Sequence, residues 1–184
     1  MKMKTILLSI VLMMIYQTIQ IIAQPVIPND LLNKFDVKVD KMDNSITYRH
    51  QYFKYRPDTQ CSIESVIFYD SKTNRHKLAL YSSYASSDWI FHDHVKFMII
   101  DTVKETSTDK RPFTNVEEGY VSEICNYHSI EDFNIVNWIA RNKDKEVLAR
   151  FVGRQGDRDF TLSDDCKSAI KETIDLYNVL NIKK

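Results

Sequence analysis

The spacing of apolar residues changes along the chain, and each change marks a different kind of segment. Residues 5–16 are almost wholly apolar and follow Lys2 and Lys4. Further on, apolar residues alternate with polar ones or form short runs, which is typical of strands. After residue 129 they recur every three or four positions, which indicates a helix. The strands are expected near residues 46–52, 63–69, 77–81, 89–100, 118–127, 147–152 and 158–162, and the helices over 130–140 and 166–180.

Two helix starts are visible in the last third of the chain. Ser129 precedes the first stripe of helical apolar residues. Asp132 lies three positions after Ser129, and this spacing resembles a capping box. The segment 163–165 (Ser-Asp-Asp) places a capping hydroxyl and two acids at the start of the last helix. The strands and helices do not alternate regularly. We therefore expect an α+β fold, an antiparallel sheet or partial sandwich with two C-terminal helices on one face.

The N-terminal run predicts export. Its basic start, short apolar core and small residue Ala23 have the order of a Sec signal peptide, with cleavage after Ala23. The alternative is a membrane anchor, but a spanning helix needs about 20 apolar residues, and Gln17 and Gln20 interrupt this stretch. We expect residues 24–34 to form an extended leader and residues 35–184 a single globular domain, secreted or periplasmic.

The charge balance bears on the kind of partner. The chain has 25 basic and 25 acidic residues, and removal of Lys2 and Lys4 with the signal leaves 23 against 25, a net charge of −2. A near-neutral chain without a basic block argues against nucleic acid and against an electrostatic membrane-surface role. The three glycines leave no phosphate-cradling loop and no hydrolase nucleophile elbow. We expect no cofactor.

Three cysteines are an odd number for an exported protein. We favour one disulfide and one buried free thiol among Cys61, Cys125 and Cys166, without a choice of pair. The alternative is three buried thiols that act as small apolar side chains.

The segment 87–91 (Ser-Asp-Trp-Ile-Phe), which leads into Val95, Lys96 and Phe97, carries a resemblance. It is similar to a group of uncharacterised exported bacterial proteins with a Trp-containing strand and a C-terminal helix–hairpin–helix arrangement. The likeness covers most of residues 35–180. It implies the element order and the exported location, and it carries over no activity and no site residues.

Histidines two apart on a strand are the candidate metal ligands. His92 and His94 would point to the same side, where two imidazoles can hold one ion. A third ligand would have to come from His50, His76 or His128. A solvated strand face is the simpler interpretation, because Lys96 lies on the same side.

Other nucleophiles and acids have simpler structural explanations. Cys125 with His128 could form a thiol–base pair, but a structural cysteine beside a cap histidine is the favoured interpretation. The adjacent acids at 164–165 and 117–118 do not face each other across a cleft as acid–base catalysis at a glycosidic bond requires.

Ligand or partner contacts have three candidates. Arg150 lies between Leu148 and Val152, where it should pair with a carboxylate or anchor an anion. Tyr48 and Tyr52 could belong to an exposed aromatic stripe, although core packing is the commoner use of strand aromatics. The remaining members of that stripe would be Phe53, Tyr55, Tyr81 and Tyr84.

The sequence favours a non-catalytic exported domain that binds a protein partner, an envelope component or a glycan. One alternative is a small secreted hydrolase whose residues converge only in the fold. Another is a structural accessory of an envelope assembly. A deep pocket with convergent polar groups would favour the enzyme, and a shallow aromatic surface would favour the binding domain.

Overall fold

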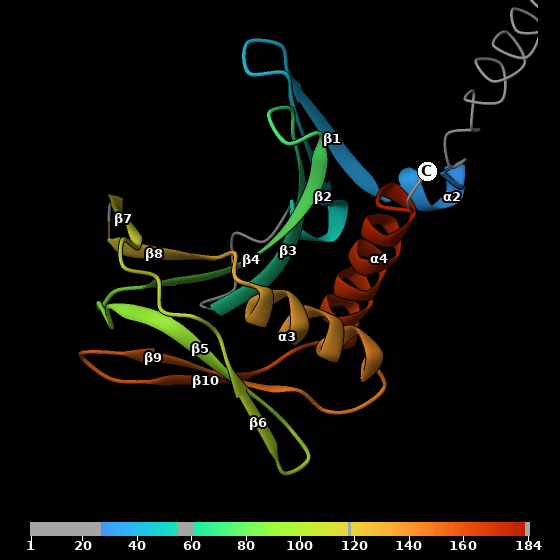
Figure 1. Ribbon diagram of the computed structural model, residues 1–184. Helices are drawn as coiled ribbons and strands as arrows, with labels where there is room; N and C mark the ends of the chain where they lie inside the picture. Colours follow the sequence, from blue (N-terminus) through green and yellow to red (C-terminus); the bar gives the residue numbers. More distant parts are fainter. Residues whose placement is uncertain (1–26, 55–60, 118, 183–184) are drawn as a thin grey trace, which may run out of the picture.

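The computed structural model describes residues 27–54, 61–117 and 119–182. It has two antiparallel sheets and two long helices, so the α+β prediction is confirmed (Figure 1). The predicted signal peptide and its cleavage site lie outside the described residues. None of the helices in the described part of the chain has the length and apolar character that a membrane span requires.

The larger sheet has six strands in the order β1-β2-β3-β4-β8-β7. Two of its tight turns carry an asparagine with positive φ, Asn44 and Asn74, both at 50°. Asparagine is among the few residues that enter the left-handed region at low cost. The strands are β1 (Phe35–Asp40), β2 (Ser45–His50), β3 (Cys61–Asp70), β4 (Arg75–Ser86), β7 (Phe113–Glu117) and β8 (Tyr120–Tyr127).

The smaller sheet has four strands in the order β10-β9-β5-β6. Val95, Phe97 and Ile99 of β5 point into the core, as their alternation predicted. The predicted break at Asp93 is present, since the register of β5 against β9 shifts between His92 and His94. The strands are β5 (His92–Ile99), β6 (Thr102–Glu105), β9 (Leu148–Gly153) and β10 (Arg158–Thr161).

The two predicted helices are α3 (Ile130–Arg141) and α4 (Asp164–Leu180), and they pack on each other and on the six-stranded sheet (Figure 1). The capping box of Ser129 and Asp132 is formed, and the Ser163 hydroxyl caps α4. Ile139 of α3, Ile170 of α4, Ile67 of β3 and Leu80 of β4 are fully buried in one hydrophobic cluster. The core therefore lies between the helices and the six-stranded sheet, and it continues into the smaller sheet.

Several predicted elements differ from the structure. The strand expected over 77–81 spans residues 75–86, the strand expected over 89–100 begins at His92, and β1, β6 and β7 were not predicted. The strand expected over 46–52 ends at His50, because the His50 ring accepts a hydrogen bond from the Tyr52 N–H and a 3-10 turn, η1 (Gln51–Phe53), follows. The expected extended leader contains a single helical turn, α2 (Asn29–Leu32), and Leu31 and Leu32 pack against the core. Alternation alone gave no sign of either turn.

Candidate functional site

A buried polar cluster lies where the two sheets meet. It consists of Ser82 on β4, His92 at the start of β5, and Glu123 and Tyr127 on β8. On β8 every second residue is buried, so Glu123 shares the inward face with Val121, Cys125 and Tyr127. A glutamate at such a position needs several hydrogen-bond donors, because an unpartnered buried carboxylate is costly.

Glu123 has those donors. Its Oε1 accepts from the backbone N–H groups of Ile90 (2.8 Å) and Phe91 (2.9 Å). Its Oε2 accepts from the backbone N–H of His92 (2.8 Å) and lies 3.0 Å from the His92 Nδ1. Phe91 has a positive φ of 54°, which turns successive N–H groups toward one carboxylate. The arrangement fixes the chain between β4 and β5 onto β8.

The other side of the His92 ring faces hydroxyl groups. Its Nε2 lies 2.9 Å from the Ser82 Oγ, which is 3.0 Å from the Tyr127 hydroxyl. A carboxylate only accepts hydrogen bonds, so His92 Nδ1 carries the proton and Nε2 accepts from Ser82. The Tyr127 hydroxyl then donates to Ser82. The order hydroxyl, imidazole and carboxylate is that of a serine-hydrolase triad.

The cluster is closed to solvent, because its four side chains are at most 1% exposed. Burial lowers the pKa of His92 and raises that of Tyr127. Burial also raises the pKa of the neighbouring Cys125 to about 12, and its Sγ donates to the His92 carbonyl at 3.2 Å. Burial therefore favours the neutral forms of His92, Tyr127 and Cys125. A nucleophile must reach its substrate, and Ser82 has no exposed surface with which to do so.

The candidate metal histidines are not brought together. The register shift separates His92 from His94. Both ring nitrogens of His92 have protein partners, and His94 Nδ1 lies 2.6 Å from the Asp93 carboxylate. Across the described ranges, no three His, Cys, Asp or Glu side chains are grouped as metal ligands.

The other candidate contact residues have partners within the chain. Arg150 is exposed and makes two hydrogen bonds of 2.6 Å to Asp159, which lies directly opposite on β10. Tyr48 is 8% exposed and belongs to the core. Tyr52 is half-buried, with its hydroxyl 2.7 Å from the Ser163 Oγ. Tyr55 of the expected aromatic stripe lies outside the described residues.

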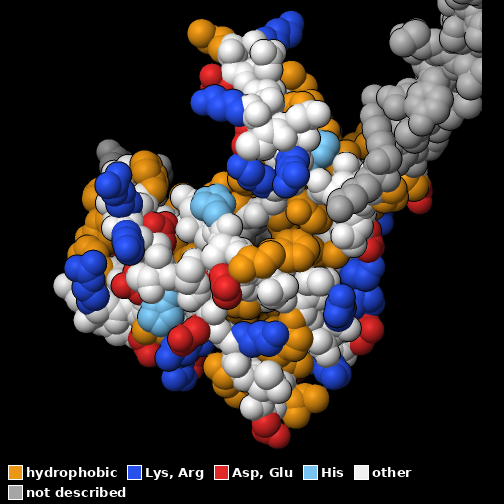
Figure 2. Space-filling view, in the orientation of Figure 1, with side chains coloured by type: hydrophobic (Ala, Val, Ile, Leu, Met, Phe, Trp, Pro, Cys, Tyr) orange, Lys and Arg blue, Asp and Glu red, His pale blue; other side chains and the backbone are white. Residues whose placement is uncertain are grey.

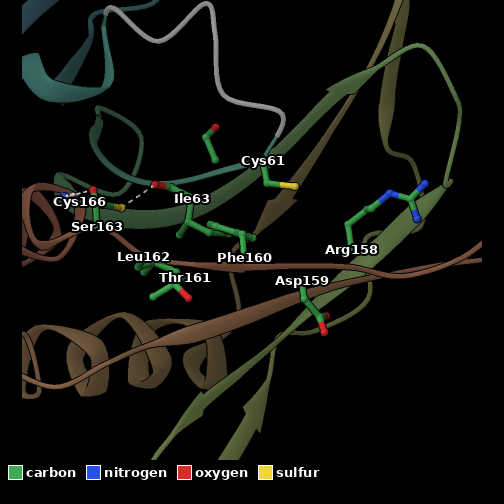
Figure 3. Close-up of a pocket in the computed structure, with 10 residues that line it drawn as sticks. Cys61, Ile63, Arg158, Asp159, Phe160, Thr161, Leu162, Ser163 and Cys166 are labelled. Carbon is green, nitrogen blue, oxygen red and sulfur yellow. Dashed lines mark hydrogen bonds between the residues drawn. The ribbon is translucent and has the colours of Figure 1, made fainter.

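The favoured prediction of one disulfide among the three cysteines is not what the structure shows. All three are free thiols. Cys61 and Cys166 line one cavity of about 370 Å³ between β3, β10 and the start of α4, and Figure 3 shows Ile63 between them. The Cys166 Sγ there donates to the Ile63 carbonyl at 3.5 Å. Cys125 points into the core and His128 is exposed, so they do not form a thiol–base pair.

A larger depression opens between β3–β4 and the helices, and we call it the apolar groove. Its volume is about 690 Å³. Phe133 and Tyr177 pack at 5.4 Å between ring centroids, and His128 meets the edge of Phe68 at 6.0 Å. Figure 2 shows hydrophobic side chains gathered in the middle of this face. The lining residues are Phe68, Lys77, Leu78, His128, Ser129, Ile130, Phe133 and Tyr177.

The polar cluster and the apolar groove were not predicted from the sequence. One signal was available for the cluster: Glu123 alternates with apolar residues on a predicted strand, and a charge on an apolar face marks a buried partner. No local pattern could have indicated Ser82. The groove residues come from β3, β4, α3, α4 and the connection between β8 and α3, so only the fold brings them together.

Comparison of the chain with protein-family models, with curated proteins and with solved structures found no match.

Proposed function

We propose that this chain is a non-catalytic exported binding domain, and that the apolar groove receives apolar side chains of a protein partner. The observation that carries the proposal is the contrast between the groove and the polar cluster. The groove is open and lined mainly by aromatic and aliphatic side chains, while the cluster with catalytic residue types is sealed. Exposed apolar surface of this kind marks interaction sites.

The composition of the groove indicates the chemistry of the partner. Ile130, 66% exposed, stands at its rim. Phe133 and Tyr177 are half-buried, so their rings are already held in place and lose little freedom on binding. The charged residue in the lining is Lys77, which is exposed and pairs with Asp70 at 2.7 Å. A segment with apolar side chains would match this surface.

The test is capture from the envelope extract of the source cells with the mature chain, residues 24–184. A captured protein is identified by mass spectrometry, purified, and titrated against the chain by calorimetry. Ile130→Glu should weaken binding about tenfold or more, because it places a charge in the apolar contact. The substitution should not disturb the N-terminus of α3, because an acidic residue is favourable in the first turn of a helix.

Val103→Glu is the matched control. Val103 lies on β6, is 57% exposed and takes no part in the groove. Equal loss of binding in both variants, or no loss in Ile130→Glu, would contradict the proposal. Binding of a purified glycan in place of a protein would also contradict the proposed protein partner and would identify the chain as a glycan-binding domain.

The hydrolase alternative is favoured by one observation, the alignment of Ser82, His92 and Glu123. A fluorophosphonate probe distinguishes the two functions, because it labels only an accessible activated serine. We expect no labelling of the folded protein. Labelling that disappears in Ser82→Ala would support the hydrolase and require an opening of the site.

A further inference from the structure

The strand β1 forms one open edge of the six-stranded sheet. It pairs with β2 on one side, and no described strand pairs with it on the other. Figure 1 shows the β1–β2 hairpin extending away from the helices. An open edge presents unpaired N–H and C=O groups that can bind another extended chain.

The side chains of β1 add an apolar strip to this edge. Val37 is 42% exposed and Val39 is 58% exposed. They lie opposite Tyr48 and Ile46 of β2, so they continue the apolar face of the sheet beyond the part that the core covers. Asp36 and Lys38 point to the opposite face and are exposed.

We propose that β1 pairs with β1 of a second copy of this chain, antiparallel, with Val37 on the two-fold axis. In that register Asp36 of one copy lies opposite Lys38 of the other, and the same contact repeats across the axis. Val37 meets Val37, and Val39 lies opposite Phe35. The alternation of acid and base along β1 therefore makes the strand complementary to itself.

The pairing would join the two six-stranded sheets into one continuous sheet. Opposite charges directly across an antiparallel pair stabilise it, and like charges destabilise it. At the other end of the sheet, residues 113–116 of β7 carry no charge, so self-pairing through them would form no such contacts. The Asp36 carboxylate also lies 3.3 Å from the Lys54 ammonium within the same chain. This pair is exposed, so Lys38 of the second copy can approach the same carboxylate.

Charge reversal tests the pairing. The mature chain is measured by sedimentation equilibrium over a range of concentrations and should show a monomer–dimer equilibrium. Lys38→Asp and Asp36→Lys should each raise the dimer dissociation constant about tenfold or more, because like charges then face each other twice. An equimolar mixture of the two variants should dimerise again. Lys72→Asp, in the β3–β4 turn, should leave the constant unchanged.

Cysteine substitution tests the register. Val37→Cys should form a disulfide-linked dimer on mild oxidation, because residue 37 faces itself across the axis and paired strands hold Cα atoms within disulfide range. Val39→Cys should not, because residue 39 faces Phe35. A strictly monomeric chain, a dimer insensitive to Lys38→Asp, or equal cross-linking at both positions would overturn the proposal.

Discussion

Glu123 on β8 accepts two hydrogen bonds from His92 at the start of β5, one from the backbone N–H at 2.8 Å and one from ring Nδ1 at 3.0 Å. The first residue belongs to the six-stranded sheet and the second to the four-stranded sheet. Because both side chains are fully buried, this contact is shielded from water and holds the sheets in a fixed relation.

Replacement of Glu123 by Gln should strongly destabilise the protein. Each carboxylate oxygen accepts two hydrogen bonds, so the amide NH₂ of glutamine would confront two N–H donors. We expect a loss of about 3–5 kcal/mol in the free energy of unfolding, as for other broken buried polar pairs. Urea denaturation followed by circular dichroism measures it.

The control is Glu105→Gln. Glu105 lies 3.5 Å from Lys96 at the surface, where an ion pair contributes less than about 1 kcal/mol. Similar losses in the two variants would show that the Glu123 network does not hold the sheets together.

Stability should fall as the solution becomes mildly acidic. Burial lowers the pKa of His92 below the ordinary value of 6.5, so below that pH the unfolded chain binds a proton that the folded chain excludes. The free energy of unfolding should therefore decrease from about pH 6.5 downward, by at most about 1.4 kcal/mol per pH unit for one proton, and level off below the folded-state pKa.

The measurement is urea denaturation at several pH values between about 7 and 5. Burial also lowers the pKa of His76, so His76→Gln separates its contribution from that of His92. Nitrogen-15 NMR of the His92 ring should show a neutral imidazole with the proton on Nδ1. A His92 pKa at or above 6.5 would refute the prediction.

Gly153 should not tolerate a side chain. A Cβ at this position would lie 2.3 Å from the Ile90 carbonyl oxygen and 2.9 Å from that of Gly156. Both are backbone atoms, so the cost of Gly153→Ala should reach the upper part of the overpacking range of about 1–3 kcal/mol. Gly119→Ala meets no atom within 4 Å and suffers only from its positive φ, at about 1 kcal/mol. Equal losses of thermal stability in Gly153→Ala and Gly119→Ala would refute the close approach of Gly153 to the Ile90 backbone.

The cysteines should react slowly in the folded protein and completely in the unfolded one. Burial raises the pKa of Cys61 to about 11 and that of Cys125 to about 12, so few thiolates form near neutral pH. Titration with an aromatic disulfide reagent in denaturant, without reductant, should release one chromophore for each of the three cysteines. Release from one cysteine alone would show that a disulfide had formed.

Regular periodicity accounts for the elements that could be predicted. Ser129 and Ser163 marked the starts of α3 and α4 because capping depends on residues within one turn. Asp93 marked the irregularity in β5 because a polar residue interrupts an apolar face. The turns at α2 and η1 were not predicted, since the hydrogen bond from the Gln51 N–H to the Lys34 carbonyl joins segments that lack any common period.

The contacts of the polar cluster and the apolar groove could not be predicted in the same way. Ser82 lies 10 residues before His92 and Glu123 lies 31 residues after it, and their hydrogen bonds depend on how β4, β5 and β8 meet. The division into two sheets also depends on this packing, because antiparallel strands of either sheet have the same alternation. His92 was therefore considered as a metal ligand, while the fold surrounds it with protein donors and acceptors.

Capping residues, helical periodicity and strand alternation were enough to predict the α+β class, the two helices and most of the strands, and they left open whether Arg150 pairs with a carboxylate or binds an anion. These follow from interactions between residues close in the chain or from the period of one face. Four features became visible only in the folded chain: the strand order, the three free thiols, the sealed Ser82–His92–Glu123 arrangement and the apolar groove. They depend on how the strands and helices pack, and the energies of their contacts depend on burial that no local pattern specifies.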